Sequence, residues 1–459
     1  MKYRNMKKII LMSAAAITLS SCGIYKKYQP ATTVPDNLYG EELSAGTDTT
    51  NFGNMSWKEV FTDPCLQTLI DSALVRNTDM QTAYLKVQEA EAALMSARLS
   101  YLPSFNFTPQ GTLSSFDGAK ASKTYSIPVA ASWEIDIFGK LTNAKRQAKA
   151  GYEQTKEYAQ AVKTQLVAGV ANTYYTLLML DAQYAIAVET EQAWKESVDV
   201  TRAMKEAGMV TEAALAQTEA TYFSIRTTVL DLREQINTTQ NTLCLLLADV
   251  PHEIKRGTLE GQQMPENFSV GIPLQMLSNR PDVRSAEMSL AQAFYGTNAA
   301  RAAFYPTITL SGSGGWTNSA GAMIVNPGKF LFSAVASLTQ PLFNRAANIA
   351  QLRIAKAQQE EAQLAFQQTL LNAGVEVNEA LEQYQTAREK AEFYTQQVAS
   401  LQTAASSTQL LMKHGSTTYL EVLTAQQTLL NAQLTQVANR VAEIQSVITL
   451  YQALGGGRM

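Results

Sequence analysis

The feature that most constrains this chain is a proline-free segment from Asn344 to Leu454 with one break, Lys413-His414-Gly415-Ser416. Before the break side chains recur at spacings of three and four, and after it the two spacings alternate without a slip, the period of a coiled-coil seam. The seam consists of Val377, Leu381, Tyr384, Ala387, Ala391, Tyr394, Val398, Leu401, Ala405, Thr408 and Met412, and then of Leu420, Leu423, Gln427, Leu430, Leu434, Val437, Val441, Ile444, Ile448 and Tyr451. We therefore predict two long antiparallel helices that meet at a turn at Gly415. At 1.5 Å per residue the longer helix extends roughly 100 Å, far more than the helices of an ordinary globular domain.

The same plan occurs twice along the chain, in the order helix, strand, strand and long helical hairpin. Matching landmarks lie near 205 residues apart: Leu102-Pro103 and Tyr305-Pro306, Ile137-Phe138 and Leu342-Phe343, Gly208 and Gly415. The sequence predicts a first repeat over 65–250, with strands near 103–115 and 124–138 and a hairpin that turns at residue 208. A connector over 251–273 leads to a second repeat over 274–455, with strands near 305–316 and 329–343 and a hairpin that turns at residue 415.

Two local predictions accompany this plan. We expect the first helix to begin near Leu66 and to continue without interruption to about Tyr101, where Leu102-Pro103 ends it. We also expect Asn326-Pro327-Gly328 to form the turn between the two strands of the second repeat.

The predicted strands alternate apolar and polar side chains, as Ile127, Val129 and Trp133 do with their neighbours. A strand of about ten residues crosses a bilayer when it is tilted. Four strands cannot close on themselves, and an open sheet edge is not tolerated in hydrocarbon. Three copies would supply twelve strands, within the range of outer-membrane barrels. The predicted fold is mainly α with a small β part. It has long antiparallel coiled-coil hairpins and four transmembrane strands per chain, internally duplicated and assembled as a trimeric α-barrel/β-barrel channel-tunnel.

The N-terminus predicts export and lipid attachment. Basic residues precede an apolar run over 9–19, and Leu19-Ser20-Ser21 then leads to Cys22. This order is typical of a secretory signal peptide over 1–21, and the cysteine resembles a bacterial lipobox. Lipid attached to Cys22 would hold the mature protein on a membrane. An ordinary signal peptide followed by an incidental cysteine is the alternative. Residues 22–64 are rich in Pro, Thr, Asn and Gly and are expected to form an extended tether.

Composition argues against several other classes of protein. The net charge is −3 and the predicted pI is about 5.7, without a basic patch, so nucleic acid is not expected as a partner. His252 and His414 lie in connecting positions and do not combine with other residues into a catalytic or metal-ligating group. We expect no enzyme, no cofactor and no metal site. Cys65 and Cys244 leave a disulfide open.

The last helix also carries a polar stripe opposite its apolar seam, formed by Thr424, Thr428, Asn431, Thr435 and Asn439. Such neutral side chains suit the wall of a water-filled channel, but they equally suit the outer face of a coiled coil in bulk water. Periodicity alone does not separate these two interpretations.

Five motifs carry a resemblance to a known family. They are Ser132-Trp133-Glu134-Ile135-Asp136-Ile137-Phe138-Gly139, Asn279-Arg280-Pro281-Asp282-Val283-Arg284-Ser285-Ala286-Glu287, Ala300-Arg301-Ala302-Ala303-Phe304-Tyr305-Pro306, Tyr419-Leu420-Glu421-Val422-Leu423 with Ala425-Gln426, and Leu450-Tyr451-Gln452-Ala453-Leu454-Gly455-Gly456-Gly457. In these motifs the chain resembles the outer-membrane efflux lipoproteins of the TolC superfamily, the NodT/OprM/CusC type, over nearly its whole mature length.

The resemblance implies a homotrimeric channel in outer-membrane lipid, with a helical tunnel in the periplasm. It implies docking on a periplasmic adaptor protein and an inner-membrane transporter of the proton-driven RND type, and export of drugs, dyes, bile salts or metal ions. The hairpin tips at Gly208, Thr211, Gly415 and Thr418 would then meet the adaptor. The periplasmic aperture would be formed at Leu420, Thr424 and Gln427.

The chain departs from the family pattern at this aperture. Members of the family often carry an acidic residue at the position of Thr424 and an arginine at that of Gln427, where these residues help to hold the aperture shut. They also often have Leu-Asp in place of Ala213-Ala214. Our hypothesis is that closure here depends more on packing around Leu420 and on neutral hydrogen bonds.

Two alternative functions stay open at the level of sequence. One is the outer-membrane exit duct of a type I protein secretion system. The other is a non-conducting, lipid-anchored coiled-coil scaffold, which would leave the alternating strands without a purpose.

Overall fold

The computed structural model describes residues 25, 27–30, 38, 52–115, 117–118, 120–265, 279–320, 323–414 and 417–458. The predicted signal peptide over 1–21, the lipidation site Cys22 and the turn residue Gly415 lie outside the described residues. The chain divides into two compact units. The first, here called the sheet unit, takes its described residues from Met1–Ala31, Lys86–Lys156 and Ser285–Gln368. The second, the helical unit, takes them from Thr32–Leu85, Glu157–Arg284 and Thr369–Met459.

The long helices repeat in length and in sequence position. Helix α5 (Lys140–Glu206) and helix α9 (Ala347–Lys413) each contain 67 residues, and α6 (Glu212–Leu246) and α10 (Tyr419–Ala453) each contain 35. Because 347 − 140, 413 − 206, 419 − 212 and 453 − 246 all equal 207, the two hairpins are copies of one design. The described elements are mostly helices with one small set of strands, so the predicted mainly helical fold with a small β part is confirmed.

Both hairpins end in the same backbone turn. After α6, Ala248 adopts φ +52°, and Asp249 N–H donates to the Cys244 carbonyl at 2.9 Å. After α10, Gly455 adopts φ +82°, and Gly456 N–H donates to the Tyr451 carbonyl at 2.9 Å. This left-handed residue followed by a bond back to the last helical turn is a Schellman motif, which satisfies carbonyls that the helix end leaves free.

The helix that precedes the first strands is broken, so the prediction of one continuous helix to about Tyr101 is wrong. Helix α3 (Pro64–Arg76) ends and α4 (Thr78–Leu99) begins on either side of Asn77. The Asn77 side-chain oxygen accepts hydrogen bonds from the backbone N–H groups of Asp79 and Met80, at 2.9 and 3.1 Å. Asparagine in this N-cap position accepts from the free N–H donors of α4. The stabilisation from these capping bonds exceeds what continuing α3 through Asn77 would provide.

Three shorter helical elements complete the described helices. A 3₁₀ turn, η2 (Phe52–Asn54), and helix α2 (Trp57–Val60) precede α3, and α8 (Pro281–Ala302) opens the second repeat. None of the helices in the described part of the chain combines the length and the apolar character needed to cross a lipid bilayer.

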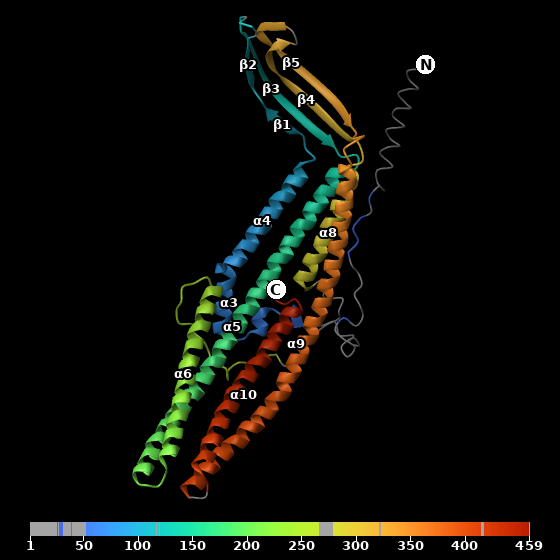
Figure 1. The fold of residues 1–459 in the computed structure, drawn as a ribbon. Helices are drawn as coiled ribbons and strands as arrows, with labels where there is room; N and C mark the ends of the chain where they lie inside the picture. The colour runs from blue at the N-terminus through green and yellow to red at the C-terminus, as the bar shows by residue number, and fades with distance from the viewer. Residues whose placement is uncertain are drawn as a thin grey trace. The chain divides into compact units, whose positions relative to one another are not determined.

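The sheet unit contains one antiparallel sheet. Its strands are β1 (Ser104–Phe107), β2 (Gln110–Ser114), β3 (Ser122–Ile135), β4 (Thr307–Ala320) and β5 (Met323–Thr339). Figure 1 shows β1 and β2 following one edge of β3, then β4 and β5 beyond it. Since β1 and β2 both pair with β3, they make one interrupted strand, and the sheet is four strands wide. The β3–β4 pair joins the two repeats, with Ile127 opposite Trp316.

The predicted turn at Asn326-Pro327-Gly328 is also wrong, because these residues lie inside β5. The ladder between β4 and β5 shifts register between Thr317 and Ser319, and this irregularity accommodates the Pro-Gly pair. A Cβ on Gly328 would lie 2.4 Å from the Tyr125 hydroxyl, so only glycine lets the strand approach here. Within the described sheet β5 pairs on one side only, where a proline without an N–H is tolerated.

The transition from the sheet to the first long helix depends on Asp136. Its carboxylate accepts from the backbone N–H groups of Leu141 and Thr142, at 3.0 and 2.7 Å, and from the Thr142 hydroxyl at 2.6 Å. A carboxylate at a helix N-terminus is stabilised by these free donors and by the helix dipole. Gly139, with φ +71°, provides the bend between strand and helix.

The helical unit buries the predicted seam. All eleven seam residues of α9 are buried or half-buried, and so are those of α10 except Leu420. The two helices do not simply pack on each other. Trp194 of α5 and Ile225 of α6 form one buried cluster with Leu423 and Leu430 of α10, so α10 also packs against the first hairpin.

Candidate functional site

The sheet has one apolar face, which is largely exposed in a single chain. Register places Val129 opposite Gly314, and Gly314 opposite Phe332, so alternate residues of all strands point the same way. The exposed apolar side chains of this face are Phe105, Phe107, Leu113, Tyr125, Ile127, Val129, Trp133, Leu310, Trp316, Phe330, Phe332 and Leu338. The opposite face carries mainly Ser and Thr, and Ser313 and Ser333 share a hydrogen bond of 3.0 Å there. Soluble monomers rarely expose an apolar patch of this extent.

Aromatic rings stand at both ends of this face. Trp133 donates its indole N–H to the Tyr101 carbonyl at 2.9 Å, near one end of the strands. Toward the other end Trp316 and Phe330 meet edge to face with 5.2 Å between their ring centroids. Aromatic side chains in such positions are typical of the interfaces between lipid and water.

The two hairpin tips share one described backbone feature, the conformation of the threonine at the N-cap of the returning helix. At the first tip Gly208 adopts φ +74° and Thr211 is the N-cap of α6, where its hydroxyl accepts from Ala214 N–H at 3.2 Å. At the second tip Thr418 occupies the N-cap of α10 with nearly the same φ and ψ, but without a side-chain capping bond. Both threonines are exposed, as is Met209 at the first tip, whose side chain is 70% exposed.

The three residues predicted for the aperture lie on the first three turns of α10 and differ in burial. Leu420 is 55% exposed and Thr424 is exposed, whereas Gln427 is half-buried in the seam. Thr424 donates its hydroxyl proton to the Leu420 carbonyl at 2.9 Å, so the hydroxyl is satisfied by its own helix. The structure therefore places Leu420 and Thr424, but not Gln427, on a free surface of the single chain.

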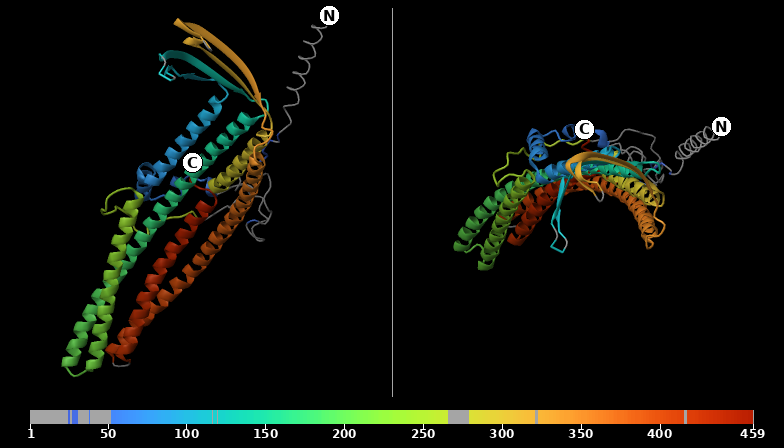
Figure 2. Two further views of the ribbon diagram at one scale, coloured as in Figure 1. Left: turned by 45° about the horizontal axis from the view of Figure 1, so that its top comes forward. Right: turned by 90° about the horizontal axis from the view of Figure 1, so that it is seen from above.

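Helix α10 is held on two sides by amide hydrogen bonds. From α5, Gln183 donates to the Leu434 carbonyl at 2.9 Å and Gln445 of α10 donates back to Thr176 at 3.2 Å. On the other side Gln436 donates to Thr395 of α9 at 3.3 Å. Asn439, which we assigned to the polar stripe, instead donates to the Ala387 carbonyl of α9 at 2.9 Å and is half-buried. Figure 2 shows α10 between α5 and α9 in both views.

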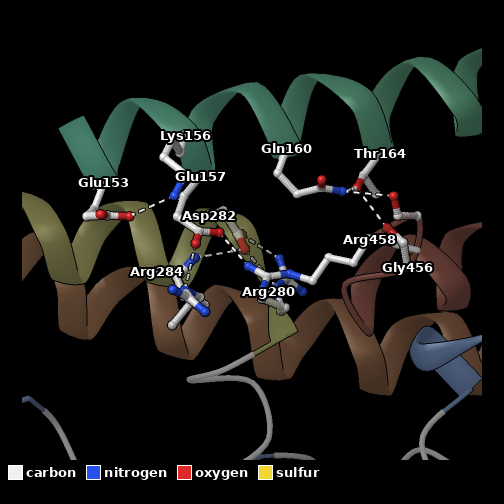
Figure 3. A network of polar contacts seen from close by, with 12 residues as sticks. Glu153, Lys156, Glu157, Gln160, Thr164, Arg280, Asp282, Arg284, Gly456 and Arg458 are labelled. Carbon is white, nitrogen blue, oxygen red and sulfur yellow. Dashed lines mark hydrogen bonds and ion pairs between the residues drawn. The ribbon is translucent and has the colours of Figure 1, made fainter. Parts of the chain in front are cut away.

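A polar network surrounds the residues that follow α10, as Figure 3 shows. Glu157 of α5 is almost completely buried and binds Arg284 at 2.8 Å and Arg458 through its other oxygen. The same helix contacts the Gly-rich tail. Thr164 donates to the Gly456 carbonyl at 2.7 Å, and Gln160 donates to the Gly457 carbonyl at 2.9 Å. We call Glu157, Gln160, Thr164 and residues 455–458 the tail clamp.

Two arginines in this region have shifted pKa values, the buried Arg280 and the half-buried Arg458. Arg280, only 5% exposed, binds Asp282 and Glu376 at 2.6 Å each. Burial lowers the pKa of Arg280, but hydrogen bonds and charges from these two carboxylates outweigh it and raise the pKa overall. For Arg458 burial prevails over the attraction of Glu157, and the pKa is lowered.

The described residues hold no arrangement that suggests catalysis or a resident metal. No group of three or more His, Cys, Asp or Glu side chains with metal-binding geometry occurs among them. Cys65 and Cys244 are both free thiols, so they do not form a disulfide with each other. The Cys244 sulfur lies 3.7 Å from Nδ1 of His252, an isolated pair next to the Val250 carbonyl.

Sequence reasoning missed several of these features. Of the tail clamp, the sequence showed only the Gly-rich motif at 455–457. The α5 residues that bind this motif lie about 300 positions earlier in the sequence. The cluster of Trp194, Leu423 and Leu430 was missed because the seam was assigned to one hairpin alone. The exposure of the apolar sheet face followed from the alternation of side chains, but its four-strand register did not.

Comparison with known proteins gives one family. The family model described as "Outer membrane efflux protein" matches residues 69–249 and 272–456. The cation efflux system protein CusC of Escherichia coli K12 is 30% identical over 452 residues, which are 98% of this chain and 99% of that protein. The probable outer membrane lipoprotein SilC of Salmonella typhimurium is 28% identical over 460 residues, 98% of each chain.

The fold agrees with solved structures. A crystal structure of CusC superposes with a TM-score of 0.85 at 29% identity, covering 95% of this chain and 100% of that one. The agreement extends over both repeats and therefore does not rest on the helical hairpins alone.

Proposed function

Because this chain belongs to the outer membrane efflux protein family, we propose that it forms the outer-membrane duct of a tripartite efflux pump. The duct is a passive conduit and has no catalytic role. It carries small toxic compounds, such as drugs, dyes, bile salts or metal ions, out of the cell. Its relatives are outer-membrane efflux components, and its location is the outer membrane.

The observation that carries this proposal is the exposed apolar face of the sheet. Phe332, 71% exposed, and Phe105, 68% exposed, stand on the same face as Trp316 and Trp133. In water such a face would cause aggregation, whereas in hydrocarbon it is the ordinary outward surface of a membrane-spanning sheet. Strands of 14 to 17 residues are long enough to cross the membrane when tilted.

The edges of the sheet support assembly into a trimer. In the described sheet β5 pairs only with β4, and β1 and β2 pair only with β3. In hydrocarbon each unpaired backbone group would cost several kcal/mol (roughly 2–7). Pairing β5 of one copy with β1 and β2 of the next removes both edges. Three copies close a sheet of twelve strands with room for a water-filled interior, whereas two copies give eight strands and a filled interior.

The partners follow from the tips and from the family. We assign the exposed tip residues Gly208, Thr211 and Thr418, together with Gly415, to contact with a periplasmic adaptor protein. The adaptor in turn connects the duct to an inner-membrane transporter of the RND type. Lipid on Cys22 would anchor the start of the mature chain in the outer membrane, and the relative SilC is itself named a lipoprotein.

For the aperture, we propose closure by packing at Leu420 and by neutral hydrogen bonds near Thr424 and Gln427. Gln427 is half-buried in a seam of apolar residues, so its amide needs a hydrogen-bond partner, which we assign to the closed aperture. Replacing Gln427 with Leu would remove that bond with little change in volume. An increase in open-channel conductance in planar bilayers would support the assignment, and an unchanged conductance would remove Gln427 from the gate.

The function is tested by deleting the gene and measuring susceptibility to drugs, dyes, bile salts, copper and silver. We expect lower tolerance to at least one class, and recovery when the gene is restored on a plasmid. Normal tolerance to every compound, combined with loss of a secreted protein from the medium, would instead favour a protein secretion duct. Restored function from a version whose sheet cannot insert would favour a non-conducting scaffold.

A further inference from the structure

We propose that the free face of α10 is a charge-free wall of the duct that admits cargo of either charge sign. This inference rests on the proposed function and specifies which class of solute the conduit passes. It concerns the segment of α10 between Glu421 and Arg440, which carries no charged side chain.

The burial of α10 leaves it a single free face. Hydrogen bonds from side-chain amides connect α10 to α5 and α9. Its Leu423 and Leu430 are buried in the cluster around Trp194. Between Glu421 and Arg440 the exposed residues are Thr424, Thr428, Asn431 and Thr435. They recur at spacings of four, three and four, so they form one narrow stripe along the helix. We call these four residues the neutral stripe.

The hydroxyl groups of the neutral stripe need no partner outside the helix. Thr424, Thr428 and Thr435 donate to the carbonyls of the residues four positions earlier, at 2.9, 2.7 and 2.7 Å. Because the three threonines are exposed, their hydroxyl oxygens can still accept hydrogen bonds from water. Such a surface stays hydrated without holding another side chain, as the wall of an aqueous channel requires.

The internal duplication provides an independent comparison. The segments 186–232 and 393–439 correspond at the offset of 207 that relates the helices. The first contains twelve Asp, Glu, Lys and Arg residues, whereas the second contains two, Lys413 and Glu421. The two hairpins therefore differ sharply in charge over these segments next to their tips, and the charge-poor segment contains most of α10.

Many charges of the first hairpin pair within it and do not form a free wall. Arg202 binds Glu219 at 2.8 Å across α5 and α6, and Lys205 binds Glu212 at the tip. The exposed Asp231 of α6 corresponds at the same offset to Ala438, so the second hairpin has no carboxylate at that position. Between Glu421 and Arg440 the free face of α10 keeps hydrogen-bonding groups and lacks fixed charge.

Fixed charge decides which ions a narrow aqueous passage admits. A ring of carboxylates concentrates cations and excludes anions, and a ring of basic residues does the reverse. Hydroxyl and amide groups can hydrate both signs. Lined by three copies of the neutral stripe, the conduit would therefore pass cationic, anionic and neutral solutes without strong preference.

The test is the ion selectivity of the full-length protein in planar lipid bilayers. The reversal potential under a KCl gradient gives the permeability ratio of K⁺ to Cl⁻, and we expect a ratio below about 3. Replacing Asn431 with Asp adds one carboxylate per chain without changing the side-chain shape. We expect this variant to raise the ratio at least about threefold.

The matched control is Gln397→Glu, which makes the same amide-to-acid change at an exposed position of α9 outside the stripe. It should leave the ratio within about 1.5-fold of the unmodified protein. Glu421→Gln and Asp231→Asn each remove an exposed carboxylate, the first three residues before Thr424 on α10 and the second on α6, and should likewise change little.

Each outcome has one meaning. Absence of any conductance overturns the proposed function itself. A conducting protein with a ratio above about 10, or a ratio that falls sharply with Glu421→Gln or Asp231→Asn, overturns the inference and leaves the duct intact. Equal effects of Asn431→Asp and Gln397→Glu would show that the neutral stripe does not face the passage, and would also overturn it.

Discussion

The guanidinium of Arg280 donates a 2.8 Å hydrogen bond to the carbonyl oxygen of Ala453, the last residue of α10. The first repeat contains the same relationship, because the side-chain amide of Asn77 donates to the carbonyl of Leu246, the last residue of α6, at 3.0 Å. Each donor stands immediately before the next helix, α8 or α4. In each half of the chain, therefore, the residue that precedes one helix donates a hydrogen bond to the last carbonyl of another.

We expect Arg280→Met to destabilise the helical unit. The change removes the donor to the Ala453 carbonyl, and leaving this acceptor unsatisfied typically costs about 1–3 kcal/mol, whereas the half-exposed carboxylates of Asp282 and Glu376 can be solvated by water. Thermal unfolding of the purified protein in detergent, followed by circular dichroism, measures the loss. Lys356→Met, an exposed site on α9, is the control and should change stability by less than about 0.5 kcal/mol. Equal midpoints for the two variants would contradict the assigned role of Arg280.

The two left-handed helix ends predict opposite effects of matched substitutions. Ala248→Gly should stabilise by roughly 1 kcal/mol, because glycine adopts φ +52° without the steric cost that alanine bears. Gly455→Ala should destabilise by more than that, since its Cβ would also lie 2.5 Å from the Asn279 carbonyl oxygen. Chemical unfolding curves of both variants measure the sign directly. A loss of stability in Ala248→Gly would refute the strain argument.

Buried tyrosines predict sensitivity to alkaline pH. Burial raises the pKa of Tyr451 to about 12 and also raises that of Tyr174, which additionally donates to Asp63. Below pH 10 both are neutral in the folded and unfolded chain, so stability is unaffected. From about pH 10 to 12 the unfolded chain ionises first, and stability falls by about 1.4 kcal/mol per pH unit for each tyrosine.

Unfolding midpoints measured from pH 8 to 11.5 test this expectation. Tyr451→Phe should lower stability at pH 8, because Gly457 N–H and the Met55 carbonyl lose a partner. The same variant should show a shallower alkaline decline. An unchanged slope would show that Tyr451 does not contribute to it.

The two faces of β5 predict different tolerance to charge. Phe332→Arg places a guanidinium on the apolar face and should cost about 2–4 kcal/mol if that face meets lipid. Ser333→Arg places the same group on the polar face at the adjacent position, where water can reach it. We expect the first variant to lose detergent-resistant oligomer from outer-membrane fractions, and the second to retain it. Equal yields would show that this face does not contact hydrocarbon.

Much of the fold could be predicted because its signals are periodic and local. The seam from Val377 to Met412 gives the helix, and the alternation around Val129 gives the strand, from spacing alone. Duplication adds strength, since each repeat supports the interpretation of the other. The two errors arose where a single side chain competes with the pattern. Asn77 caps a new helix inside a helical run, and Gly328 permits a strand to continue through a Pro-Gly pair.

The candidate site was less accessible to sequence reasoning for a physical reason. Whether Thr424 or Asn439 is free depends on which helices cover α10, and these contacts join residues far apart in the chain. A helical stripe predicts which residues share a face, but not which neighbour covers that face. The same limit hid the partners of the tail clamp.

The tail clamp also governs the order of events during synthesis. Thr164 and Glu157 emerge from the ribosome early, yet the residues that satisfy them, Gly456 and Arg458, follow roughly three hundred positions later. Helix α5 therefore cannot reach its final set of contacts before Gly456 and Arg458 are made. The helical unit stays incomplete until then, which suits a polypeptide that must cross one membrane before it settles in another.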